Sequence, residues 1–154
     1  MKHQREYQHG QSLVEMVVVI GVVVLLAVGI IAGTTASLSA TQNAQTRSNA
    51  LKFASEGIER TRELRDAGWN AFAALGEVES TYCVGDDGEF TLAATSCTSP
   101  NIEDRYIRAI TLALVPAGDE YPAEKMSVRV AVSWEGTTQL GNSVELVTYL
   151  TQWR

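Results

Sequence analysis

A single carboxylate, Glu15, stands at the start of a segment that carries no other charge. Gly10 precedes it by five residues, and no charged residue follows it until Arg47. An ionised carboxylate inside a bilayer costs at least a few kcal/mol, so such a residue is a functional-site hypothesis by default. Two interpretations follow. Glu15 either lies at the membrane edge and reaches the headgroups, or it pairs with a cation of another molecule.

A cut after Gly10 supplies a suitable cation. The shortened chain begins at Gln11 with a free α-amine, and Glu15 becomes its fifth residue. The amine of one subunit can then pair with Glu15 of a neighbour inside an apolar assembly, where a buried ion pair selects register more than it adds stability. We therefore expect Gly10 and Gln11 to be processing residues and Glu15 to be an assembly residue.

The residues around Glu15 are long and apolar enough to cross a membrane as a helix. Counted from Leu13, the apolar stretch reaches the roughly 20 residues that a membrane helix needs. Basic residues precede it, so the positive-inside rule places residues 1–10 in the cytoplasm and the C-terminal body outside. The alternative is a cleaved secretory signal with small residues at 32–36 as its cleavage site. That alternative leaves Glu15 without a role.

The pattern divides the chain into a leader, two helical parts and a sheet. Their ranges are 1–10 for the leader, 11–33 for the membrane or filament-core helix, 34–67 for its amphipathic continuation, and 68–154 for a loop and antiparallel sheet. No proline occurs before Pro100, so nothing breaks the helix. We expect Gly68 to end it in a left-handed conformation. Helical spacing predicts a buried stripe of Ala44, Arg47, Leu51, Ala54, Ile58 and Thr61.

From Trp69 onward the pattern indicates strands and turns. Residues 126–134 alternate strictly between apolar and small or polar side chains, as a half-buried strand does. Further strands are expected at 81–84, 89–92, 105–115 and 144–150, with a turn at 85–88 and a hairpin loop at 135–143. The second half of the long helix is the available cover for their apolar faces. The fold class is therefore α+β, a long N-terminal helix whose C-terminal half packs on a small antiparallel sheet.

Composition narrows the function classes. The net charge is -6, and the negative excess lies in residues 34–154. This argues against a sequence-independent nucleic-acid binder, whose affinity rests on Lys and Arg, although local basic patches stay open. The only histidines, His3 and His9, lie in the leader. Their loss weakens most acid–base and nucleophilic enzyme mechanisms, so we expect no enzyme and no cofactor.

Cys83 and Cys97 are the only cysteines. The expected topology places both outside the cytoplasm, where disulfides persist, so we expect them to pair. Two thiols without a nearby histidine are too few ligands for a metal site. The acidic turn at 86–89 is too short for a calcium loop of the EF-hand kind, and a solvated turn is the better interpretation. We expect no metal site.

The residues from 10 to 15, followed by an apolar helix, resemble the N-terminal motif of type IV pilins and pseudopilins. The resemblance implies that a prepilin peptidase cuts after Gly10 and methylates the new N-terminus at Gln11. It also implies that Glu15 is the glutamate that this family uses in assembly, and that the fold is pilin-like. Gln11 stands where the family usually has phenylalanine.

The resemblance implies a structural subunit, a minor pilin, of a type IV pilus-like filament at the cell surface. Its partners would be the prepilin peptidase, other pilin subunits, an inner-membrane assembly platform, and membrane lipid before assembly. Two alternatives stay open. One is a pseudopilin of a type II secretion or DNA-uptake machine, and the other is a membrane-anchored extracellular binding domain that never polymerises.

Overall fold

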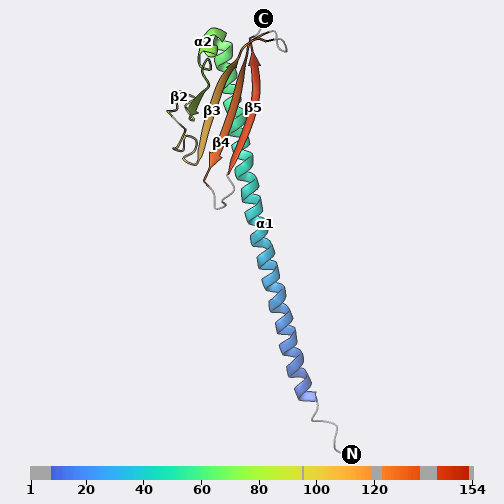
Figure 1. Cartoon of the computed structure of the whole chain (residues 1–154). Helices are drawn as coiled ribbons and strands as arrows, with labels where there is room; N and C mark the ends of the chain where they lie inside the picture. Colours follow the sequence, from blue (N-terminus) through green and yellow to red (C-terminus); the bar gives the residue numbers. More distant parts are fainter. Residues whose placement is uncertain (1–7, 95, 119–122, 136–141, 153–154) are drawn as a thin grey trace, which may run out of the picture. The chain divides into compact units, whose positions relative to one another are not determined.

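The computed structural model describes residues 8–94, 96–118, 123–135 and 142–152, with side chains from Leu13 onward. The chain forms two compact units, Met1–Ala44 and Gln45–Arg154. One helix, α1 (Gln8–Ala67), runs through both (Figure 1). The expected long helix is thus confirmed, and it begins three residues before the proposed cleavage site.

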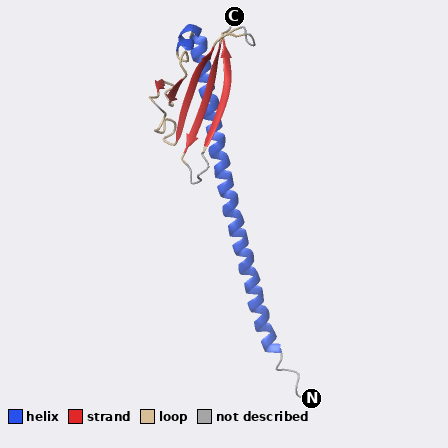
Figure 2. Ribbon diagram, in the orientation of Figure 1, coloured by secondary structure: helices blue, strands red, loops and turns tan. Residues whose placement is uncertain are grey.

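Five strands follow the helices and form one antiparallel sheet (Figure 2). They are β1 (Ser80–Val84), β2 (Phe90–Leu92), β3 (Tyr106–Val115), β4 (Lys125–Trp134) and β5 (Ser143–Thr151). Their spatial order is β2-β1-β3-β4-β5. The strands β3 and β4 pair along their whole length, from Tyr106 opposite Trp134 to Val115 opposite Lys125. The predicted α+β fold is confirmed, and the hairpin loop expected at 135–143 lies mostly outside the described residues.

The alternation in β4 sets the two faces of the sheet. Met126, Val128, Val130 and Val132 are fully buried, whereas Arg129 between them is exposed. The buried side chains form one core with the C-terminal part of α1 and with the inner side chains of β3. The period-2 pattern therefore identifies the face that packs on the helix.

The helix meets the sheet mostly through small side chains, which let its backbone lie close to the strands. The buried positions of this face are Ala50, Phe53, Ala54, Gly57 and Thr61. A Cβ added at Gly57 would lie 2.9 Å from Cγ1 of Val130. The predicted stripe was therefore wrong at three positions: Ala44 and Arg47 are exposed, and Leu51 is 39% exposed.

A short helix, α2 (Trp69–Ala74), occupies a region where strands and turns were expected. Trp69 and Phe72 are buried and meet edge to face, with ring centroids 5.8 Å apart. Gly68 has a φ of 163°, which is extended and not left-handed as predicted, because its carbonyl accepts the first bond of α2 from the Phe72 N–H. Burial of two aromatic rings at one end of the core outweighs the weak local pattern.

Candidate functional site

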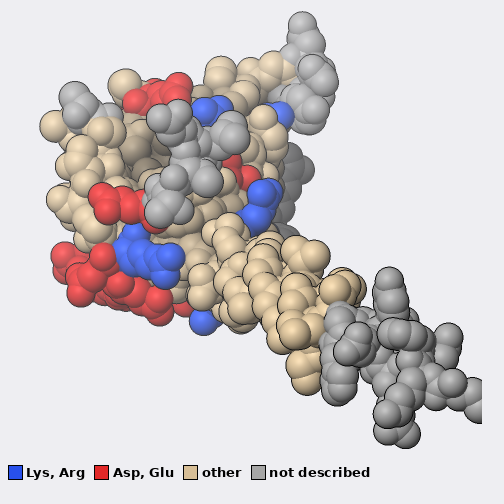
Figure 3. Space-filling view, turned by 90° about the horizontal axis from the view of Figure 1, so that it is seen from below, with Lys and Arg blue, Asp and Glu red and all other residues tan. Residues whose placement is uncertain are grey.

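The N-terminal part of α1 carries an apolar surface that no described residue of the chain covers. Its large apolar side chains from Leu13 to Ile31 are between 51% and 74% exposed. By length and composition, this helix is long and apolar enough to cross a membrane. In Figure 3 this stretch is largely tan, in contrast with the red and blue side chains of the second unit. An exposed apolar surface of this extent marks a membrane or protein contact.

The three residues singled out by the sequence lie on this same helix. Gly10 and Gln11 fall in its described backbone, and Glu15 is exposed one helical turn further on. Among the described side chains, none forms an ion pair with Glu15. Helical side chains lean toward the N-terminus, so the carboxylate of Glu15 lies near the level of Gln11. The helix therefore brings the acid and the expected cleavage point to one end of the apolar surface.

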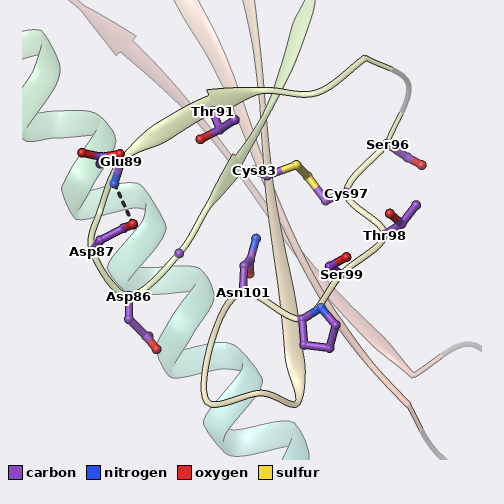
Figure 4. A pocket seen from close by; sticks show the side chains of 12 residues that line it. Cys83, Asp86, Asp87, Glu89, Thr91, Ser96, Cys97, Thr98, Ser99 and Asn101 are labelled. Atoms are coloured by element: carbon purple, nitrogen blue, oxygen red, sulfur yellow. Dashed lines mark hydrogen bonds between the residues drawn. A yellow bond between two sulfur atoms is a disulfide. The ribbon is translucent and has the colours of Figure 1, made fainter.

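The expected disulfide is confirmed. Cys83 in β1 and Cys97 are joined, with their Cα atoms 5.6 Å apart. Neither thiol is free, so the pair is not a metal or redox site in this form. The bond ties the segment after β2 back onto β1 (Figure 4). In the chain-entropy model a closed loop of this size stabilises a fold by about 3 kcal/mol.

A polar pocket of about 600 Å³ lies beside the disulfide. Three carboxylates line it, but they point in different directions (Figure 4). Asp87 accepts a hydrogen bond from the backbone of Glu89 at 3.0 Å, and Asp86 accepts one from the backbone of Glu103 at 3.3 Å. Among the described residues, no three ligating side chains converge as a metal site would require. The carboxylates of Asp86 and Asp87 accept hydrogen bonds from the backbone, as expected for acidic residues in a solvated turn.

The most constrained polar side chain is Arg108 in β3, which the sequence interpretation did not single out. It is 3% exposed. Its guanidinium donates to the carbonyls of Val84 at 3.0 Å, Gly85 at 2.7 Å and Phe53 at 3.2 Å. Arg108 thereby ties β3 to α1 and to the turn after β1. Its place in the strand could have indicated this burial, because Arg108 alternates in step with the inward-facing apolar residues of β3.

Nearby carboxylates favour the charged form of Arg108, whereas its burial disfavours that form. Burial lowers the pKa of Arg108 from its ordinary value, and the nearby carboxylates of Glu56, Asp86 and Asp87 oppose this shift. Among these carboxylates, the Oε2 of Glu56 lies 3.7 Å from Nη1 of Arg108. No described nucleophile or acid–base partner accompanies this guanidinium among its hydrogen bonds, which all go to backbone carbonyls. The guanidinium thus links the backbone of α1 to that of β1 and of the turn after it.

No protein-family model, curated protein or solved structure matches the chain. The features of this chain that bear on function are the apolar part of α1 and the residues at its N-terminal end.

Proposed function

We propose that this chain is a structural subunit, a minor pilin, of a type IV pilus-like filament. A prepilin peptidase removes the leader after Gly10 while the N-terminus lies in the cytoplasm and the sheet-bearing unit lies outside. The subunit then leaves the bilayer and assembles through α1. The observation that carries this proposal is the exposed apolar part of α1, with one carboxylate at its N-terminal end.

The apolar part of α1 suits two surroundings in succession. Each fully buried Val, Leu or Ile side chain contributes about 1.5 to 3 kcal/mol relative to exposure, so this surface requires a cover. Lipid supplies that cover first, and the helices of neighbouring subunits supply it after assembly. Residues 16–46 carry no charge, so neither transfer desolvates a charged side chain of that segment.

Glu15 gives the assembly its selectivity. Pairing with the α-amine of Gln11 in a neighbour neutralises both charges, and only one axial position brings the two groups together. Leaving one member of a buried ion pair without its partner costs about 3 to 5 kcal/mol. A subunit out of register therefore carries that penalty, which disfavours its incorporation.

The replacement Glu15→Ala tests this proposal. We expect the variant to be processed and inserted normally, while the amount recovered in sheared filaments falls by at least about tenfold. The matched control is Glu63→Ala, which removes an exposed α1 carboxylate that pairs with Arg60 at the surface. An unchanged filament fraction for Glu15→Ala would contradict the proposal and favour an anchored domain that never polymerises.

A further inference from the structure

The stretch of α1 from residue 33 to residue 45 gains little from packing or charge. Every residue in it is exposed. None of them is charged, whereas Arg62 and Glu59 form an ion pair further along the helix. Among the described side chains, Ala50 is the first on α1 that joins the core of the sheet-bearing unit. Residues 33–45 therefore depend on the intrinsic stability of the helix.

The amino acids of this stretch make that intrinsic stability low. Six of the twelve residues from 34 to 45 are Ser, Thr or Asn, which form helices less readily than Ala or Leu because their side chains compete for backbone hydrogen bonds. The hydroxyl of Thr34 donates to the Ile31 carbonyl at 2.9 Å, and that of Thr41 donates to the Ser37 carbonyl at 2.9 Å. Such bonds slightly destabilise and bend a helix. An isolated helix of about 12 to 15 residues is marginal in water even when it is rich in alanine, so this stretch opens more readily than its neighbours.

The same stretch contains one signal that ends helices and another that begins them. Gly33 follows the apolar residues, and glycine commonly ends a helix because it adopts the left-handed conformation without strain. Ser39 and Gln42 have the spacing of a capping box, in which the serine caps a new helix and the glutamine side chain bonds back to the serine N–H. The helix α1 runs through both signals. They can therefore cap two separate helices when residues 34–38 open.

Lipid on one side and the sheet on the other confine the opening to this segment. In a bilayer, the backbone of the apolar residues 13–32 stays helical because its polar groups find no other partner in hydrocarbon. From Ala50 onward, burial of α1 against the sheet opposes opening. Residues 34–38 lie between these two regions and are exposed. Water can therefore satisfy the backbone groups that their opening releases.

We propose that α1 opens at residues 34–38 into two helices, the first ended by Gly33 and the second begun by Ser39. The open segment acts as a swivel, about which the apolar helix and the sheet-bearing unit turn independently while they stay connected. This inference rests on the proposed function, because lipid is what keeps residues 13–32 helical. The swivel lets the sheet-bearing unit meet other subunits while the apolar helix is still in the bilayer.

Hydrogen exchange of the full-length protein in lipid bilayers tests the opening. Amide protection reports how often each part of a helix opens, and we expect residues 35–40 to be protected at least about tenfold less than residues 16–31 and 50–66. Protection of residues 35–40 equal to that of residues 50–66 overturns the proposal. Equally weak protection of residues 16–31 overturns the confined opening and also contradicts the membrane helix of the proposed function.

Two substitutions favour the closed helix and remove the caps of the open one. Gly33→Ala makes a left-handed helix end costly, and Ser39→Ala removes the cap of the second helix. Alanine also has the better helix propensity in both cases. Each substitution should raise the protection of residues 35–40 severalfold, and the two together should raise it by at least about tenfold. Unchanged protection in the double variant overturns the proposal.

Each substitution has a matched control on the same helix. Gly21→Ala is the control for Gly33→Ala, because a Cβ added at either glycine meets nothing within 4 Å. Ser37→Ala is the control for Ser39→Ala, because it brings the same gain in helix propensity but has Ala40, and no Gln or Glu, three residues further on. Both controls should raise the protection of residues 35–40 less than their counterparts do. Equal effects overturn the assignment of Gly33 and Ser39 as caps.

The filament assay separates this inference from the proposed function. Filaments from a chain whose residues 35–40 are as protected as residues 50–66 contradict the swivel alone. Weak protection confined to residues 35–40, in a protein that forms no filament, supports the swivel and contradicts the filament.

Discussion

Replacing Arg108 with methionine removes the guanidinium but keeps most of the apolar side chain. Three carbonyls, those of Val84, Gly85 and Phe53, then lose a donor. A buried polar group that loses its partner costs about 1 to 3 kcal/mol. The acceptors belong to the backbone, so no second substitution removes them. Because three carbonyls are affected, we expect the free energy of unfolding to fall by about 3 to 5 kcal/mol, in the lower part of the range for three such groups.

The loss of Glu56 as a partner adds little to this value. Its side chain is 55% exposed and its carboxylate lies 3.7 Å from the guanidinium, so solvent screens the pair. The matched control is Arg129→Met, which breaks an exposed pair with Glu145 on the outer face. Exposed pairs contribute up to about 1 kcal/mol. The two arginine variants thus differ in burial while sharing the same chemical change.

Urea unfolding of the full chain in detergent measures the difference. Trp69 is 8% exposed, and the ring of Trp134 lies 6.2 Å from that of Tyr106, so tryptophan fluorescence reports on the sheet-bearing unit. With a urea dependence of about 1 to 3 kcal/mol per molar, Arg108→Met should lower the midpoint by about 1 to 5 M. If its midpoint falls no further than that of Arg129→Met, the guanidinium does not hold α1, β1 and β3 together.

Two other predictions concern the same unit. Replacing Cys83 and Cys97 with serine opens a closed loop with a sequence separation of 14. We expect this double replacement to lower the free energy of unfolding by about 3 kcal/mol in the same urea titration. An unchanged midpoint would show that the disulfide does not stabilise the fold. The change Gly57→Ala places a Cβ 2.9 Å from Val130 and should cost about 1 to 2 kcal/mol despite the better helix propensity of alanine. Gly33→Ala meets nothing within 4 Å, so a midpoint that moves as far as that of Gly57→Ala would contradict the clash.

The sequence predicts the elements better than it predicts how they meet. The alternation at 126–134 corresponds to β4, and the absence of proline before Pro100 corresponds to an unbroken α1. Both signals are local and repeat over many residues. The buried face of the helix was harder to predict because Leu51, a large apolar side chain, is 39% exposed. Close approach of α1 requires small residues such as Gly57, which carry no hydrophobic signal.

Arg108 was missed for a related reason. A charged residue in a strand is usually assigned to the exposed face, yet its position in β3 is an inward one. Its burial depends on carbonyls that come from residues 53, 84 and 85, and no local pattern foretells that they meet. On the helix surface, Arg60 pairs with Glu63, three residues further along α1. Long side chains on a helix can reach several neighbours at similar cost.

The residues of the proposed function lie close together in the sequence. A glycine, a single carboxylate and a charge-free segment lie within one continuous stretch of sequence. The pairing with Glu15 requires that the α-amine of Gln11 keep its charge, and a free N-terminal glutamine can cyclise and lose that charge. Methylation or prompt assembly would preserve the partner of Glu15.

The mass of the mature protein, together with sequencing of its N-terminus after extraction from membranes, tests the central claim most directly. We predict a chain that begins at Gln11 and retains a charged amine, with or without an added methyl group. A loss of ammonia would mean a cyclised Gln11 and would contradict the pairing with Glu15. A chain that still begins at Met1, or one that begins beyond Gly33, would contradict processing after Gly10 and with it the filament subunit.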